Sequence, residues 1–233
     1  WNYPYMTAIN TIAPALIAGN VVALKHATQT LLVGERLVDA FISVGIPKDV
    51  FINMYLDHDT TSRLIEDNSF DFVNFTGSLR GGIEIERAAA GTFTPVGTEL
   101  GGKDPGYVME DADLDAAVET LIDGAMFNSG QCCCGIERIY VVESLYEKFL
   151  QKAINIVENY KLGNPLEPET TIGPMANKRF SDEVRLQINE AVELGATAHI
   201  EVFKNDDAGT YVTPQILTGV DHNMRIMKDE TFG

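Results

Sequence analysis

The three cysteines of this chain are consecutive, at residues 132–134. A thiolate is a strong nucleophile, and it works only where the backbone exposes it and a nearby base can take its proton. Small residues surround the three thiols, with Ser129 and Gly130 before them and Gly135 after them, and such residues let a substrate carbonyl come close. The stretch therefore predicts attack of a sulfur on a carbonyl carbon. The alternative is that all three are buried, inert cysteines.

The composition argues against several kinds of partner. The 34 acidic residues outnumber the 17 basic ones, and the formal net charge of −17 argues against binding to nucleic acid or to an anionic membrane. The 45% hydrophobic content is enough for a core, and no apolar run reaches the roughly 18 residues that a membrane span needs.

The cysteine and histidine pattern indicates the compartment and excludes a metal centre. Three adjacent cysteines cannot form a disulfide framework, which suggests a reducing compartment, and we expect the cytoplasm. The four histidines are scattered without metal-ligand spacing, so we predict no metal site.

The elements that must position the thiols alternate between strand and helix. In the first half of the chain we expect strands at 21–25, 50–55, 70–75 and 96–100. Helices are expected at 30–44, 60–66 and 78–90, the second of them capped by its threonines. This alternation is typical of a doubly wound parallel sheet, which binds ligands at the carboxyl ends of its strands. Lys25 and residues 76–78 are expected at such ends.

The pattern restarts after the glycine pair at 101–102, which we interpret as the domain boundary. Strands are expected at 106–109, 138–142, 197–203 and 211–217, and helices at 114–125, 146–157 and 181–194. Residues 161–177 are expected to form a loop that contains prolines and glycines.

Five short motifs occur along this framework. They are Trp1-Asn2-Tyr3-Pro4, Phe75-Thr76-Gly77-Ser78, Glu99-Leu100-Gly101-Gly102-Lys103, Gly130-Gln131-Cys132-Cys133 and Glu230-Thr231-Phe232-Gly233. With these motifs in this order, essentially the whole chain resembles the aldehyde dehydrogenase superfamily. The resemblance implies an α/β fold in which residues 1–101 form part of a Rossmann-like NAD(P)-binding domain. Residues 102–233 then form a truncated α/β catalytic domain. Because the chain starts without methionine and stops inside a family motif, the resemblance suggests a fragment, roughly the middle half of a family-length chain.

The resemblance also implies catalytic roles. Cys133 would be the nucleophile, and the Asn2 side-chain amide together with the Cys133 backbone N–H would hold the oxyanion. Glu99 would be the general base that activates water for hydrolysis of a thioester. Cys132 and Cys134 are better interpreted as structural. The plainer alternatives are a turn residue before Pro4 for Asn2 and a solvated residue at a strand end for Glu99.

The expected cofactor is NAD or NADP. By resemblance, Ser78 contacts the pyrophosphate, Lys25 the adenosine ribose and Glu230 the nicotinamide ribose. Gly77 and Gly82 flank the start of a helix, where N–H groups can face a phosphate, although this spacing is not the dinucleotide fingerprint. The remaining residues expected at the cofactor are Trp1, Thr28, Leu100 and Phe232.

Two positions depart from the family pattern. Thr28 stands where members that prefer NAD usually carry a glutamate, so the preference between NAD and NADP stays open. Thr11 stands where many members carry a lysine that relays protons. Tyr5 and Phe127 are expected either to line the aldehyde tunnel or to be core residues.

Three functions are compatible with these residues. The first is hydrolytic oxidation of an aldehyde to a carboxylic acid, by a full-length protein that is a homo-oligomer. The second is a coenzyme A-acylating semialdehyde dehydrogenase, which Glu99 argues against because such members generally lack this base. The third is a catalytically silent fragment of the same fold.

Overall fold

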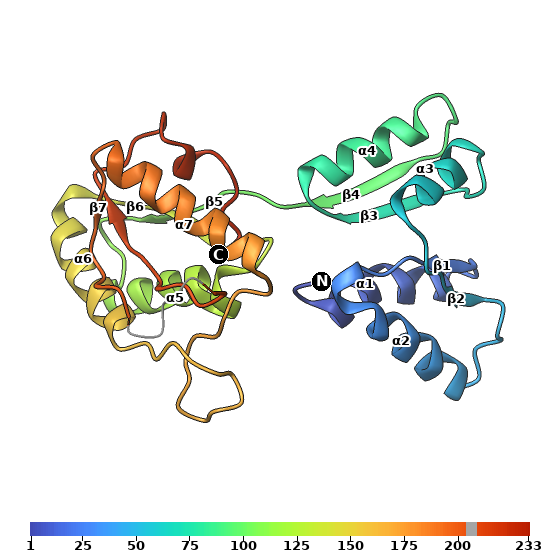
Figure 1. Cartoon of the computed structure of the whole chain (residues 1–233), viewed down its shortest axis with the longest axis horizontal. Helices are drawn as coiled ribbons and strands as arrows, with labels where there is room; N and C mark the ends of the chain where they lie inside the picture. Colours follow the sequence, from blue (N-terminus) through green and yellow to red (C-terminus); the bar gives the residue numbers. More distant parts are fainter. Residues whose placement is uncertain (204–208) are drawn as a thin grey trace. The chain divides into compact units, whose positions relative to one another are not determined.

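The structure is a computed structural model that describes residues 1–203 and 209–233. The chain divides into two compact units, Trp1–Leu100 and Gly101–Gly233, which Figure 1 shows in blue to green and in green to red. The division falls within one residue of the boundary expected from the glycine pair.

The first unit contains two parallel strand pairs, each built around a helix. β1 (Val22–Leu24) pairs with β2 (Phe51–Asn53), and α2 (Leu31–Ser43) connects them. β3 (Val73–Gly77) pairs in the same way with β4 (Val96–Leu100). The connecting helix there is α4 (Leu79–Ala89), which lies along its strand pair in Figure 1.

The predicted alternation of strand and helix is therefore confirmed for this unit. The extended sheet predicted from it takes the form of two separate pairs, because no ladder joins β1–β2 to β3–β4 among the residues that the structure describes. Each pair is a strand–helix–strand unit, the minimum that parallel pairing requires.

A helix that the sequence pattern did not predict opens the unit. α1 (Pro4–Ile17) includes Pro14, and an interior proline normally argues against a helix because it removes a backbone donor. Tertiary packing outweighs this cost, since Ile12 of α1 is buried against Leu37 and Phe51. Pro4 occupies the first turn, where a missing N–H is tolerated.

The short helix α3 (His58–Glu66) corrects the predicted cap. The sequence analysis assigned the cap to the threonines, but the Asp57 carboxylate accepts the hydrogen bond from Thr60 N at 2.7 Å. An aspartate just before the first turn satisfies an unpaired N–H and also interacts favourably with the helix dipole. A threonine already inside the first turn cannot replace it.

The second unit begins with another parallel pair. β5 (Asp104–Val108) pairs with β6 (Ile136–Val141), and α5 (Leu114–Met126) lies between them in the chain. The other helices are α6 (Glu143–Glu158), α7 (Lys178–Glu193) and the single turns η2 (Phe127–Gly130) and η3 (Arg225–Met227). The first unit has one further turn, η1 (Thr28–Thr30).

The strands predicted at 197–203 and 211–217 are much shorter than expected. Only β7 (Thr197–Ala198) and β8 (Leu217–Thr218) pair, and they do so antiparallel. Beyond them the Gln215 side chain accepts a hydrogen bond from Ile200 N at 3.2 Å and donates one to Ile200 O at 2.8 Å. A side chain that takes both backbone partners competes with the ladder and ends it.

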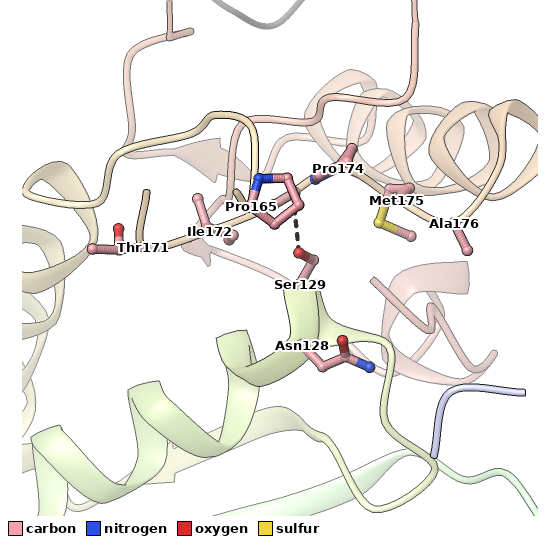
Figure 2. A pocket seen from close by; sticks show the side chains of 9 residues that line it. Asn128, Ser129, Pro165, Thr171, Ile172, Pro174, Met175 and Ala176 are labelled. Carbon is pink, nitrogen blue, oxygen red and sulfur yellow. Dashed lines mark hydrogen bonds between the residues drawn. The ribbon is translucent and has the colours of Figure 1, made fainter. Parts of the chain in front are cut away.

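The loop predicted at 161–177 is confirmed, with one isolated bridge between Leu162 and Ile172. Lys161 N donates to Thr171 Oγ1 at 2.7 Å, so the two ends of the loop are tied together. The later part of the loop, residues 171–176, runs beside Ser129 at the end of η2, as Figure 2 shows.

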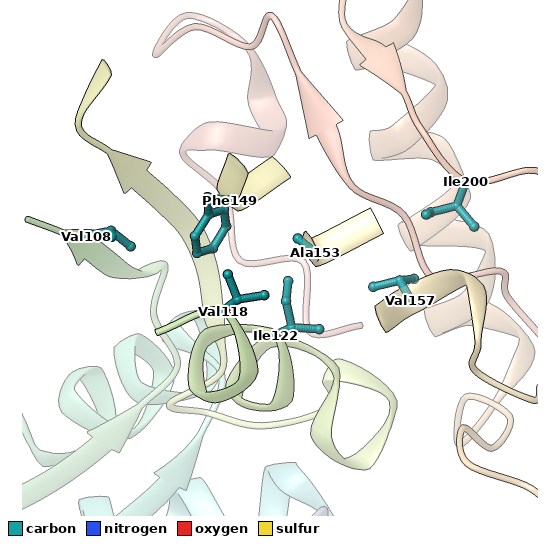
Figure 3. Packing of buried hydrophobic residues seen from close by; sticks show 7 residues of the cluster. All are labelled: Val108, Val118, Ile122, Phe149, Ala153, Val157 and Ile200. Atoms are coloured by element: carbon teal, nitrogen blue, oxygen red, sulfur yellow. The ribbon is translucent and has the colours of Figure 1, made fainter. Parts of the chain in front are cut away.

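The main hydrophobic core belongs to the second unit (Figure 3). Helix α5 contributes residues four positions apart, and helix α6 contributes residues at intervals of four, which is the spacing of one helical face. The buried members are Val108, Val118, Ile122, Phe149, Ala153, Val157 and Ile200. Within residues 1–203 and 209–233, no helix has the length and apolar character to cross a bilayer.

Candidate active site

The segment before the cysteines has a strained backbone. Asn128, Ser129 and Gly130 have φ angles of 53°, 58° and 72°. A left-handed conformation costs an L-residue about 1–2 kcal/mol, so two consecutive non-glycine residues of this kind need support from their surroundings.

Side-chain hydrogen bonds supply that support. Asn128 Nδ2 donates to Gln131 O and Gln131 Nε2 donates to Asn128 O, both at 3.1 Å. Ser129 Oγ donates to Gly173 O at 2.9 Å (Figure 2). Ala176 N donates to Gln131 Oε1 at 2.8 Å. Gln131 is buried. The glutamine of the cysteine motif therefore anchors this loop to residues 173–176.

A cavity of about 420 Å³ lies at this junction. Backbone and small side chains make up much of its wall, which consists of Asn128, Ser129, Pro165, Thr171, Ile172, Gly173, Pro174, Met175 and Ala176 (Figure 2).

The cysteines that follow differ in their surroundings. Cys133 and Cys134 are exposed and Cys132 is partly buried, so the alternative of three buried cysteines is wrong. Cys132 Sγ lies 3.4 Å from Cys134 Sγ. The hydrogen bond to Cys132 raises the pKa of the Cys134 thiol to about 11. Cys134 therefore stays protonated near neutral pH, in agreement with the structural interpretation of this residue.

Glu230 lies over the glycine pair that opens the second unit. A β-carbon at position 101 would collide with the Glu230 carboxylate, so this side chain keeps its present position only with glycine there. Burial, followed by repulsion from Glu137, raises the pKa of Glu230, while the Gly102 N–H and Lys103 act in the opposite direction.

The residues after Glu230 converge on Glu137 of β6. Thr231 N donates to the two oxygens of the Glu137 carboxylate at 3.2 and 2.9 Å, and Phe232 N donates at 2.9 Å. Lys103 Nζ lies 2.5 Å from Glu137 Oε2, with 7% and 9% of the two side chains exposed. Burial lowers the pKa of Lys103, and the charge of Glu137 opposes that change.

Glu137 was not predicted as a site residue, because it belongs to none of the five motifs. One signal was available. A charged residue beside a strand expected in a parallel sheet, four positions after Cys133, needs a buried partner.

In the first unit, Asn2 directly precedes the cap residue of α1. His26 fixes the start of that helix: its Nε2 lies 3.0 Å from Pro4 O, and its Nδ1 lies 3.1 Å from Thr30 Oγ1. A carbonyl can only accept, so Nε2 carries the proton and Nδ1 accepts from the Thr30 hydroxyl. Lys25 follows β1 at its carboxyl end, immediately before His26.

The turn from β3 into α4 brings four predicted residues together. Ser78 caps α4 by accepting a hydrogen bond from Gly81 N at 3.2 Å. Gly77 ends β3 opposite Leu100 of β4. A β-carbon on Gly82 would lie 2.8 Å from Leu100 Cδ2, so this glycine makes room for the leucine. The Gly82 N–H is already bonded to Ser78 O at 2.9 Å within the helix.

Glu99 and Thr28 are both exposed, on β4 and at the start of η1 respectively. Tyr5 and Phe127 are 50% and 55% exposed, so the alternative that they are core residues is wrong. Thr11, at the position where a lysine was expected, accepts a hydrogen bond from Asn74 Nδ2 at 2.8 Å.

The predicted site residues are thus distributed over both units. Asn2, Lys25 and Glu99 belong to the first unit, and Cys133 and Glu230 belong to the second. In the part of the chain that the structure describes, no three His, Cys, Asp or Glu side chains are grouped so that they could hold a metal ion.

Comparison with known proteins gives matches over the entire chain. The model of the aldehyde dehydrogenase family matches residues 1–233. Succinate-semialdehyde dehydrogenase [NADP(+)] of Mycobacterium avium (strain 104) is 33% identical over 233 residues, which are 100% of this chain and 49% of that protein. The chain therefore spans about half the length of the curated relatives it matches.

Solved structures of aldehyde dehydrogenases also match over the entire chain. Lactaldehyde dehydrogenase from Escherichia coli matches with a TM-score of 0.93 at 32% identity, over 100% of this chain and 49% of that one. A double mutant of betaine aldehyde dehydrogenase from Staphylococcus aureus, in complex with NAD+, matches with a TM-score of 0.93 at 32% identity, over 100% of this chain and 48% of that one.

Proposed function

Since the chain belongs to the aldehyde dehydrogenase family, we propose that the protein containing it oxidises an aldehyde to a carboxylic acid with NAD or NADP. The observation that carries the proposal is the exposed Cys133 directly after a strained loop that buried Gln131 holds in place. Strain of this kind tends to occur where a nucleophile must be presented.

In the proposed mechanism, Cys133 releases its thiol proton to solvent, and the thiolate Sγ attacks the aldehyde carbon to form the thiohemiacetal anion. The Asn2 side-chain amide and the Cys133 backbone N–H donate hydrogen bonds to the resulting oxyanion. NAD(P), when bound, would supply the acceptor for the hydride that the former aldehyde carbon loses. The thioester that remains is hydrolysed by a water whose proton Glu99 takes, which releases the carboxylic acid and regenerates the thiol.

The residues present fit a dinucleotide in both units. In the second unit Glu230, over Gly101, would hold the ribose hydroxyls next to the nicotinamide, with Phe232 beside it. In the first unit the start of α4 at Ser78 offers its helix dipole to the pyrophosphate. Lys25 would bind the adenosine ribose, and Thr28 and Trp1 are the other residues of this unit that we assign to the cofactor.

Both NAD and NADP are included because Thr28 carries no carboxylate that would repel a 2′-phosphate. The named relatives support this breadth, since one bears NADP(+) in its name and another was solved with NAD+.

The two units would have different roles in the reaction. We assign Trp1–Leu100 to the NAD(P)-binding domain and Gly101–Gly233 to the catalytic domain. Homo-oligomerisation of the protein and a cytoplasmic location belong to the same proposal; the three free thiols support a reducing compartment.

The test compares cysteine variants in the full protein that contains this chain. Cys133→Ala should abolish aldehyde-dependent NAD(P)H formation, whereas Cys134→Ala should retain it. Unchanged turnover by Cys133→Ala would refute the assignment.

Two further measurements separate the alternatives. Turnover that requires coenzyme A would favour the acylating type and would contradict the role of Glu99. Calorimetric titration of the isolated 233-residue chain with NAD tests the silent alternative, since absence of binding would support it.

A further inference from the structure

We propose that Glu137 is the positioning residue that holds the cofactor-binding segment 230–232 in place. This inference rests on the proposed function, because it assumes that Glu230 and Phe232 face the nicotinamide ribose. Glu137 would contact neither cofactor nor substrate, and it would act through the backbone of that segment.

The backbone N–H groups of the segment 230–232 point toward Glu137. Two consecutive N–H groups, of Thr231 and Phe232, point at the same carboxylate at 2.9 to 3.2 Å. Successive N–H groups converge in this way when one residue is left-handed, and Phe232 has φ 56°. A phenylalanine keeps that conformation only where the surroundings determine it.

The Glu137 carboxylate belongs to a hydrogen-bond network that returns to the segment 230–232. Lys103 Nζ pairs with Glu137 and also donates to Thr231 Oγ1 at 2.6 Å. The Thr231 hydroxyl donates to Gln187 Oε1 at 2.8 Å, and Gln187 Nε2 donates to Glu230 O at 3.3 Å. A buried ion pair is weak evidence for stability, and its better-supported use is to select one geometry.

Two of the motifs contact Glu137, and a third, the cysteine motif, lies just before it in the chain. Lys103 ends the Glu-Leu-Gly-Gly-Lys motif, and Glu137 follows the cysteine motif by four residues. Arg138 donates from Nε to Lys103 O at 2.9 Å, which adds a second link between the same two segments. The segment 230–232 is thus held against the strand that leaves the cysteine loop.

The geometry also predicts that Glu137 affects the pH dependence of cofactor binding. The groups that face Glu230 are Glu137 from β6, Lys103 and the Gly102 N–H from the segment before β5, and the neutral Gln187 from α7. Repulsion from Glu137 contributes to the raised pKa of Glu230. Removing that charge should move the pH dependence of cofactor binding to lower pH.

The experiment uses the full protein with Glu137→Gln, Glu137→Asp and the control Glu143→Gln. Glu143 is an exposed acid on the first turn of α6. Kd for NAD and NADP is measured by calorimetry as a function of pH, together with the KM of the cofactor, kcat, and the alkylation rate of Cys133 by iodoacetamide.

We expect Glu137→Gln to weaken cofactor binding at least about tenfold, the size expected for the loss of charge-assisted hydrogen bonds. An amide offers one acceptor oxygen, and its NH₂ group opposes Lys103. Glu137→Asp should restore part of the affinity, and Glu143→Gln should match the wild type. The KM of the cofactor should rise while the alkylation rate of Cys133 stays unchanged.

The inference would be overturned if Glu137→Gln bound the cofactor with wild-type affinity and an unchanged pH profile. The proposed function would still stand in that case if the protein kept wild-type turnover. Equal loss in Glu143→Gln would also overturn it. A wild-type protein that neither binds NAD(P) nor turns over would instead refute the proposed function. Should Glu137→Gln fail to fold, the double variant Lys103→Met/Glu137→Gln removes both charges and serves in its place. That double variant should show the same tenfold loss, and wild-type affinity in it would refute the positioning role.

Discussion

The carboxylate of Glu230 occupies the space that a β-carbon on Gly101 would need, although the two residues are far apart in the sequence. Because the glycine pair leads directly into β5, the position of this carboxylate is set by the backbone of the second unit. Any side chain at position 101 would displace the Glu230 carboxylate from this place.

The first prediction tests this relationship with Gly101→Ala. The methyl group should displace the flexible Glu230 carboxylate and weaken NAD(P) binding, with little effect on the free energy of unfolding. Chemical denaturation and calorimetric titration measure the two effects. Gly102→Ala is the matched control, because its β-carbon would meet Asp104 Oδ1, at 2.9 Å, and would displace a carboxylate that is not assigned to the cofactor site. Equal effects of the two variants would contradict the prediction.

The second prediction concerns the pH dependence of stability. Burial raises the pKa of Glu230 above its ordinary value of 4.5, so the folded state holds this proton more tightly than the unfolded state. Its contribution to stability is present below about pH 4.5 and is lost as the pH rises through the folded-state pKa. Glu230→Gln should therefore raise Tm relative to the wild type at pH 7, and the gain should shrink toward pH 4.

The third prediction separates two roles of Ser78. As the cap of α4, Ser78→Ala should cost about 1 kcal/mol of stability, whereas Ser78→Asp should keep the cap and lose little. The carboxylate of Ser78→Asp would repel a pyrophosphate, so cofactor affinity should fall in this variant with Tm nearly unchanged. Cofactor binding by Ser78→Asp that equals the wild type would remove Ser78 from the cofactor site.

The fourth prediction ranks the thiols. A pKa of about 11 leaves Cys134 with roughly one thiolate in a thousand at pH 8, so iodoacetamide should label exposed Cys133 first. Cys132→Ala removes the hydrogen bond that raises this pKa and should speed the labelling of Cys134. Peptide mass spectrometry after timed alkylation gives the order, and earlier labelling of Cys134 in the wild type would contradict it.

The fifth prediction addresses the loop before the cysteines. Gly130 and Gly219 have φ angles of 72° and 70°, so alanine at either position costs about 1–2 kcal/mol for the conformation alone. A β-carbon on Gly130 would also enter the backbone of Gly233, whereas at Gly219 the nearest atom is an ordinary 3.5 Å away. Gly130→Ala should therefore destabilise the protein more than Gly219→Ala in urea denaturation. Equal losses would show that the contact with Gly233 yields easily.

Much of the fold could be predicted from the sequence because the relevant forces are local. The helices α5 and α6 follow from apolar residues spaced along one face, and Ser78 caps α4 where strand gives way to helix. Where a local rule was outweighed, the prediction was incomplete or wrong. Helix α1 forms in spite of Pro14 because Ile12 is buried, and the Gln215 side chain ends the pairing of β7 with β8.

The amino-acid sequence by itself determined which groups can do chemistry, because a thiol run and the motifs around it are visible in residue order. Only the tertiary structure decided which residues hold these groups in position. Glu137 and Lys103 lie 34 positions apart and meet in a buried pair, and Thr231, from near the end of the chain, joins them. Contacts between distant segments depend on how the backbone folds in three dimensions, and no local pattern of residue types specifies them.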